Sequence, residues 1–131
     1  NITQTTAPHA MSYKITSLYK LPHGHAVAVC LPEVWQYMLD YPEKCVEERG
    51  YDYLSEVFNA IAKTLGVGSA TEGVLFMRSI LKEMELSYPI GKNRSEELDL
   101  LTVSVNPVRL KNNPVLIDTQ ASQSLFAKIL Q

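Results

Sequence analysis

The sequence predicts an all-α protein, a bundle of five to six helices that forms one domain over residues 1–131. The chain has 131 residues, which is long enough for one domain with a buried core. Apolar residues recur mostly three or four positions apart, the period of a helix that buries one face. Glycine, proline and helix-capping signatures separate these segments, and little of the chain alternates as a strand would. Together these observations favour a helical bundle.

Three helices are predicted in the first half of the chain. The first covers about residues 8–19, with Pro8 in its first turn and Thr5 or Thr6 as N-cap. The breaker cluster "LPHG" ends it, and the apolar segment at about 25–39 fits a helix better than a buried strand. After a turn at "DYPEK", residues 51–65 form an amphipathic helix closed by Gly66. Its expected inward residues are Leu54, Val57, Phe58, Ile61, Ala62 and Leu65.

Capping signatures divide the second half. "SATE" at 69–72 is a capping box that opens a helix to about Leu86, and "NRSE" at 93–96 opens another to about Val103. The alternating "LTVSV" within the latter leaves a strand as an alternative. "NPVRLKNNP" at 106–114 predicts an irregular loop, and Asp118 or Thr119 caps a final helix. The inward residues are expected to be Val74, Met77, Ile80, Leu81 and Met84 in the first of these helices, and Leu125, Phe126, Ile129 and Leu130 in the last.

Composition excludes several classes of function. The net charge is −2 with a pI near 5.9, and no Lys/Arg cluster indicates nucleic-acid binding. The longest apolar run, "HAVAVCLPEVW", is shorter than the ~18 residues of a membrane span. Two cysteines are too few for a disulfide scaffold; Cys30 is expected to be buried and Cys45 to lie on an exposed helix or loop. A reduced, cytoplasmic setting is the simplest expectation.

All three histidines, His9, His23 and His25, lie within 17 positions. His9 is on a predicted helix, and His23 stands at the turn before the next one. If that turn folds the second helix back, the two imidazoles could meet, and neutral imidazole is the commonest metal ligand in proteins. Two histidines supply half a coordination shell, with Asp40, Glu33 and His25 as further candidates. From the residues alone, a metal site and a structural role both stay open.

Other side chains near the histidines could take part in chemistry. Tyr13 follows His9 by four positions and therefore shares its helical face, where a phenol could orient a substrate or pass a proton. An ordinary half-buried tyrosine is the alternative. An anionic ligand could pair with a basic side chain, although each of these could equally be a solvated surface residue: Lys14, Arg78, Arg109 and Lys111.

The stretch "PHAMSYKITSLYKLPHGHAVAVCLPEV" resembles the metal-binding region of the iron-containing (group III) alcohol dehydrogenases. That family carries a histidine in an "HxMxH" helix, a "PHG" histidine 14 residues later, and a small apolar run that ends in "LP". Here His9 and His23 are 14 positions apart, "PHG" is 22–24, and Leu31 and Pro32 supply "LP". The resemblance implies the helical, dehydroquinate-synthase-like C-terminal domain of a longer two-domain dehydrogenase. An N-terminal NAD(P)-binding domain would be absent from this chain.

The resemblance also implies roles for individual residues. In the family, one Asp and three His hold a divalent ion, Fe²⁺ or Zn²⁺, and His9 and His23 match the last two of these ligands. Tyr13 stands where many members have a second histidine near the nicotinamide, which makes it the catalytic candidate. His25 and Lys14 are candidates for supporting the ligands or contacting substrate.

Within the family, "HAMSYKIT…HGHAVA" is most similar to the phosphonoacetaldehyde reductases. The implied substrate is a small aldehyde or alcohol, here one that carries a phosphonate. The full-length protein is expected to be a homo-oligomer, and the chain alone is expected to be inactive.

Two alternatives remain. "HGHAVAV" has some likeness to dehydroquinate synthase, so a dehydroquinate-synthase-like or glycerol-dehydrogenase-like domain is one; those groups space their ligand histidines differently, and Leu39 stands 16 positions after His23. The other is a non-catalytic helical interaction domain without metal. It predicts that the rings of His9 and His23 lie far apart or are satisfied by backbone groups.

Overall fold

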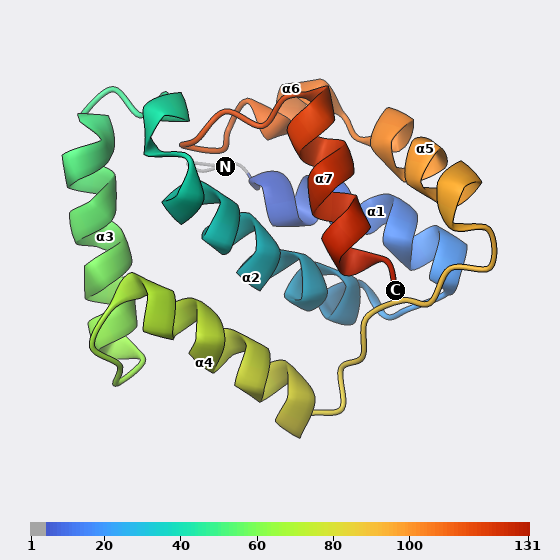
Figure 1. Ribbon diagram of the computed structural model, residues 1–131, viewed down its shortest axis with the longest axis horizontal. Helices are drawn as coiled ribbons and strands as arrows, with labels where there is room; N and C mark the ends of the chain where they lie inside the picture. The colour runs from blue at the N-terminus through green and yellow to red at the C-terminus, as the bar shows by residue number, and fades with distance from the viewer. Residues whose placement is uncertain (1–4) are drawn as a thin grey trace.

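The computed structural model describes residues 5–131 and confirms the all-α fold (Figure 1). No strand forms within these residues; one isolated bridge pairs Cys45 with Val115. None of the helices between residues 5 and 131 combines the length and apolar character needed to cross a lipid bilayer. The described helices are α1 (Ala7–Tyr19), α2 (His23–Asp40), the short 3₁₀ turn η1 (Pro42–Lys44), α3 (Gly50–Thr64), α4 (Ala70–Glu83), α5 (Arg94–Ser104), α6 (Pro107–Leu110) and α7 (Thr119–Ile129).

Helix α2 lies at the centre of the bundle. It packs against α1, α4 and α7, while α3 meets α4 at one end and α5 lies against both α1 and α7 (Figure 1). The short α6 packs on α1. Cys30 of α2 is buried, as expected, and this burial raises the pKa of its thiol to about 12. The largest fully buried side chains come from five helices and the segment before α7, and they include Met11, Ile15, Val29, Val34, Leu101, Val115 and Phe126.

Two of the predicted helix starts are confirmed in atomic detail. Ser69 Oγ accepts a hydrogen bond from the backbone N–H of Glu72 at 3.2 Å. The Glu72 carboxylate reaches back to the N–H of Gly68 at 2.6 Å, one residue before the position that the capping box predicts. Asp118 Oδ1 accepts from the N–H of Ala121 at 2.8 Å and so caps α7. Short-range polar chemistry therefore decides where α4 and α7 begin.

The prediction of an irregular loop over 106–114 is wrong in part, because α6 forms within it. Asn106 Oδ1 accepts from the N–H of Val108 at 2.9 Å, and Pro107 occupies the first turn. The first Asn-Pro pair therefore acts as an N-cap followed by a preorganised first residue rather than as a turn. The strand alternative for "LTVSV" is also wrong, since α5 continues to Ser104.

Two residues predicted to face inward are exposed. Ile61 is 43% exposed because α3 packs mainly against α4, which covers only the stripe of Leu54, Phe58 and Ala62. Met84 is 63% exposed because α4 ends at Glu83, and the chain then turns at Glu85 with a left-handed φ of 57°. The helical period alone does not show how wide a face the neighbours cover.

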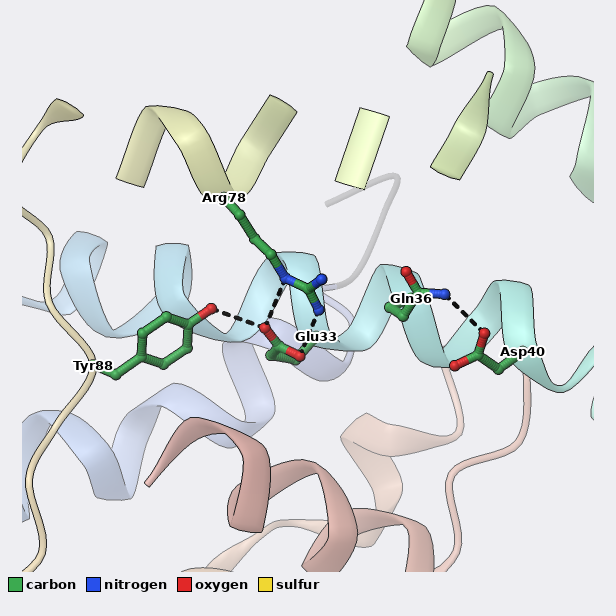
Figure 2. A network of polar contacts seen from close by, with 5 residues as sticks. All are labelled: Glu33, Gln36, Asp40, Arg78 and Tyr88. Carbon is green, nitrogen blue, oxygen red and sulfur yellow. Dashed lines mark hydrogen bonds and ion pairs between the residues drawn. The ribbon is translucent and has the colours of Figure 1, made fainter. Parts of the chain in front are cut away.

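A buried carboxylate joins three parts of the fold. Glu33 of α2 is 5% exposed and accepts hydrogen bonds from the Arg78 guanidinium of α4 at 2.9 and 3.2 Å (Figure 2). It also accepts from the Tyr88 hydroxyl at 2.8 Å, on the connection between α4 and α5. Burial and the neighbouring carboxylate raise the pKa of Tyr88 to about 12. All these donors satisfy a charge that would otherwise be costly to bury.

Replacement Glu33→Ala is expected to lower the free energy of unfolding by about 2 kcal/mol, because it leaves the Arg78 and Tyr88 donors without their acceptor. Urea unfolding followed by circular dichroism measures this. Gln36→Ala, one turn further along α2, is the control: Gln36 bonds only the exposed Asp40, at 2.7 Å (Figure 2). That control is expected to stay within about 0.5 kcal/mol of the wild type. Equal effects of the two replacements would contradict the assignment.

Gly73 of α4 leaves room for the ring of Trp35, and Gly73→Ala is expected to destabilise the protein. A Cβ at this position would lie 2.6 Å from the Trp35 ring, which is 5% exposed and packs near Phe58. Overpacking of this kind costs about 1–3 kcal/mol, which exceeds the roughly 1 kcal/mol that Ala gains over Gly in a helix. Gly24→Ala, where a Cβ meets nothing within 4 Å, is the matched control and is expected to be neutral or stabilising. Thermal unfolding of both variants checks the opposite signs.

Candidate metal centre

Helix α1 presents a polar face beside a buried one. The helix begins after Thr6 with Pro8 in its first turn, as predicted, although the Thr6 side chain makes no capping hydrogen bond. Met11 and Ile15 are fully buried and hold the inner face in the core. His9 and Tyr13 lie one turn apart on the same face; His9 is half-buried and Tyr13 is 48% exposed.

The connection between α1 and α2 brings the third ring to this face. Lys20 ends α1 with a left-handed φ of 55°, and Pro22 precedes the first residue of α2, which is His23. The His23 ring lies near parallel to the ring of Tyr13, with 5.5 Å between centroids. It lies tilted to the ring of His9, with 5.7 Å between centroids. The structure thus brings together the two histidines that sequence spacing singled out.

This separation suits two ligands of one ion. A histidine nitrogen binds zinc at about 2.0–2.1 Å, which puts the ring centroid about 3.2 Å from the ion. Two such rings in a tetrahedral shell have centroids about 5 Å apart, close to the observed 5.7 Å. The separation of the two rings is therefore compatible with shared coordination of one ion.

Arg109 of α6 completes the cluster from a distant part of the chain. Its guanidinium carbon lies 4.7 Å from the centroid of the Tyr13 ring, a cation–π contact. Asn112 Nδ2 donates to the carbonyl of Thr5 at 3.3 Å and helps to hold this segment beside the start of α1. Sequence analysis named Arg109 only as one of several cations. Its place beside Tyr13 depends on α6, which was not predicted.

The supporting candidates His25 and Lys14 lie outside the ring cluster. His25 follows His23 by two positions, which places it on a different face of α2, and a ring nitrogen lies 2.8 Å from the carbonyl oxygen of Ser87. Lys14 is half-buried and lies about 100° around α1 from Tyr13. His25 therefore anchors the α4–α5 connection, and Lys14 adds positive charge next to the cluster.

The carboxylates considered as further ligands have other partners. Glu33 bonds Arg78 and Tyr88, and Asp40 accepts from Gln36 near the end of α2 (Figure 2). Within residues 5–131, no group of three or more His, Cys, Asp or Glu side chains is placed to hold a metal ion. Among the described residues, the rings of His9 and His23 thus lie together without a third such side chain beside them.

Comparison with known proteins assigns the chain to a family. Residues 1–129 match the Fe-containing alcohol dehydrogenase family, C-terminal. The chain is also similar to the phosphonoacetaldehyde reductase of Streptomyces viridochromogenes, with 28% identity over 128 residues. The matched region is 97% of this chain and 32% of that relative, so the chain spans about a third of the relative's length. No solved structure matches the chain.

The family match covers nearly the whole chain, and it includes both histidines of the cluster, the "PHG" turn and the final helix. It confirms the resemblance that the spacing of His9 and His23 indicated. The chain therefore belongs to the iron-containing alcohol dehydrogenase family, whose C-terminal region it matches.

Proposed function

We propose that the chain is the metal-binding helical domain of an NAD(P)-linked alcohol dehydrogenase or aldehyde reductase, in which His9 and His23 hold a divalent ion, Fe²⁺ or Zn²⁺. The observation that carries the proposal is the meeting of their two rings, 5.7 Å apart, from different helices. Membership of an iron-containing family supports the choice of ligand. Imidazole binds both of these metals.

The proposal includes a longer protein in which residues 1–131 are one C-terminal domain. The chain covers 32% of its reductase relative, which leaves length for an NAD(P)-binding domain. The Asp and the further His that family members use as ligands would come from outside this chain. We propose a homo-oligomeric, cytoplasmic enzyme.

The chain's own residues would bind the ion, orient the carbonyl substrate and protonate its oxygen. When bound, the ion supplies Lewis acidity at a carbonyl oxygen, and NAD(P)H supplies hydride to the carbonyl carbon. His9 and His23 would hold the ion through ring-nitrogen lone pairs. The half-exposed Tyr13 lies against His23, and its phenolic O–H gives a proton to the substrate oxygen as a general acid. Lys14 adds positive charge beside this face, and His25 holds the connection between α4 and α5 without contacting the ion.

The proposed substrate is a small aldehyde or alcohol. Phosphonoacetaldehyde is the specific candidate, because the similar protein from Streptomyces viridochromogenes is a phosphonoacetaldehyde reductase. The family match favours this chemistry over the dehydroquinate-synthase-like alternative. A metal-free interaction domain would give no reason for the rings of His9 and His23 to converge.

The 131-residue chain is expected to bind Co²⁺, as a spectroscopic substitute for Fe²⁺ or Zn²⁺, weakly and through His9 and His23. His9→Ala and His23→Ala should each weaken this binding by more than about tenfold, because each removes half of the ligand pair. Isothermal titration calorimetry measures the affinity, and paramagnetic shifts of histidine NMR signals report which rings are bound. His25→Ala is the matched control and should leave the affinity unchanged.

Loss of Co²⁺ binding in His25→Ala but not in His9→Ala would contradict the ligand assignment. Unchanged Co²⁺ affinity in both His9→Ala and His23→Ala would show that these histidines do not bind the metal. Circular dichroism of each variant checks that the fold survives.

The isolated chain is expected to show no aldehyde-dependent oxidation of NADPH above a buffer blank. Residues 5–131 contain two proposed ligands and form no strand–helix–strand unit that could bind a dinucleotide. Absorbance at the nicotinamide band, with phosphonoacetaldehyde and Fe²⁺ or Zn²⁺ present, measures the rate. Turnover by the chain alone would show that the division between two domains is wrong.

A further inference from the structure

Acidic residues are absent from the two segments that form the candidate centre. Residues 1–32 and residues 100–117 contain no Asp or Glu, yet they carry four basic residues. The other segments hold all 14 acidic residues and eight of the 12 basic ones. Helix α1 and helix α6, which come from these two segments, pack together. The helix that carries His9 and the helix that carries Arg109 therefore contribute basic and no acidic side chains where they meet, in a chain of net charge −2.

Glu97 is an acidic side chain that does reach α1, but it does so at the far end of the helix. There its carboxylate accepts from the Tyr19 hydroxyl at 2.6 Å and from the backbone N–H groups of Lys92 and Asn93. These hydrogen bonds hold the pKa of Glu97 below its usual range. The Glu97 carboxylate is thus already hydrogen-bonded, and its contact with α1 is at Tyr19, six positions after Tyr13.

The Arg109 guanidinium makes no side-chain hydrogen bond or ion pair among residues 5–131. No carboxylate in this part of the chain forms an ion pair with it, and its guanidinium carbon lies 4.7 Å from the centroid of the Tyr13 ring. A cation–π contact provides no carboxylate acceptor, so N–H groups of the guanidinium remain to donate to a ligand. The guanidinium is a planar fork that matches two oxygens of a phosphonate, phosphate or carboxylate.

The arrangement of the neighbouring side chains indicates what the Arg109 guanidinium could bind. Arg109 lies on Tyr13, Tyr13 lies on His23, and His23 lies beside His9. An oxyanion held by Arg109 would place the rest of a short molecule along the Tyr13 ring, towards the histidine pair. Lys14 offers only a flexible point charge and lies around the helix from Tyr13.

We infer that Arg109 is the specificity-determining residue of this site and binds the phosphonate or phosphate group of a short carbonyl substrate. The inference rests on the proposed function of the same site. It assigns recognition of the anionic group to α6 and placement of the carbonyl to the α1–α2 histidines. Neutral aldehydes would lack the contact with Arg109.

The test is binding of methylphosphonate to the ¹⁵N,¹³C-labelled 131-residue chain, without metal or NAD(P). Saturable shifts are expected for the Arg109 Nε–H and the Tyr13 ring. Arg109→Gln should weaken the affinity by about tenfold or more, because it removes a charge-assisted pair of hydrogen bonds. Arg109→Lys keeps the positive charge but not the planar guanidinium, so its affinity for methylphosphonate should lie between those of the wild type and Arg109→Gln. Lys63→Gln, at an exposed lysine near the end of α3, is the matched control and should bind as the wild type does.

Unchanged affinity in Arg109→Gln, or wild-type affinity in Arg109→Lys, would overturn the inference. So would an equal loss in Lys63→Gln, which would indicate a non-specific charge effect, or the absence of saturable binding to the wild type. Tyr13 and His23 ring signals at their wild-type positions show that Arg109→Gln keeps the cluster folded.

The phosphates of NAD(P) offer the same oxyanion chemistry as a substrate, and ADP is the probe for that source. A larger loss for ADP than for methylphosphonate in Arg109→Gln would assign Arg109 to the cofactor and overturn its role with substrate. Co²⁺ binding by the histidines is measured separately. Failure of methylphosphonate binding with intact Co²⁺ binding would thus overturn the role of Arg109 alone, whereas the reverse result would overturn the proposed metal centre.

Discussion

The packing of α2 against α1 is the contact on which the rest of the structure depends. The left-handed turn at Lys20 and the fixed φ of Pro22 return the chain, and buried residues such as Met11, Ile15 and Val29 hold the two helices in place. Each buried side chain of this size contributes about 1.5–3 kcal/mol. The same packing that forms the core brings His23 to His9, so the candidate centre follows from the hairpin itself. α4 and α7 then pack on other faces of α2.

Local chemistry was sufficient to predict most of the helices, whereas the resemblance to a known family selected His9 and His23 as a ligand pair. Ser69 and Asp118 act within three residues of themselves, so their capping could be predicted without tertiary structure. From the residues alone a metal site and a structural role both stayed open, and the 14-residue spacing of His9 and His23 was informative because it matches the spacing in that family. The contact of Arg109 with Tyr13 joins residues that are 96 positions apart, and no periodicity or motif indicates such a pairing. The exposure of Met84 likewise depends on where α4 ends.

Charged groups in this domain differ in burial, and the difference separates a structural role from a ligand-binding role. Glu33 is enclosed, and its donors from α4 and from Tyr88 make it a structural link (Figure 2). The cluster around Tyr13 and His23 is open to solvent, and its cation has no carboxylate partner within the described residues. An enclosed and satisfied carboxylate resists exchange with ligands, whereas exposed and unpaired groups can accept them. The chemistry is therefore expected at the α1–α2 surface rather than at the polar contact that is buried most deeply.

The four-residue helix α6 places the proposed substrate-binding residue on a different element from the proposed metal ligands. The histidines belong to the hairpin of α1 and α2, whose buried residues pack against the rest of the domain. Arg109 belongs to a short helix bounded by two Asn-Pro pairs, which packs on α1 from outside. Mutation in this peripheral segment could redirect substrate choice while the metal-holding helices stay intact. The architecture thus allows substrate preference to evolve, or to be engineered, independently of the reaction itself.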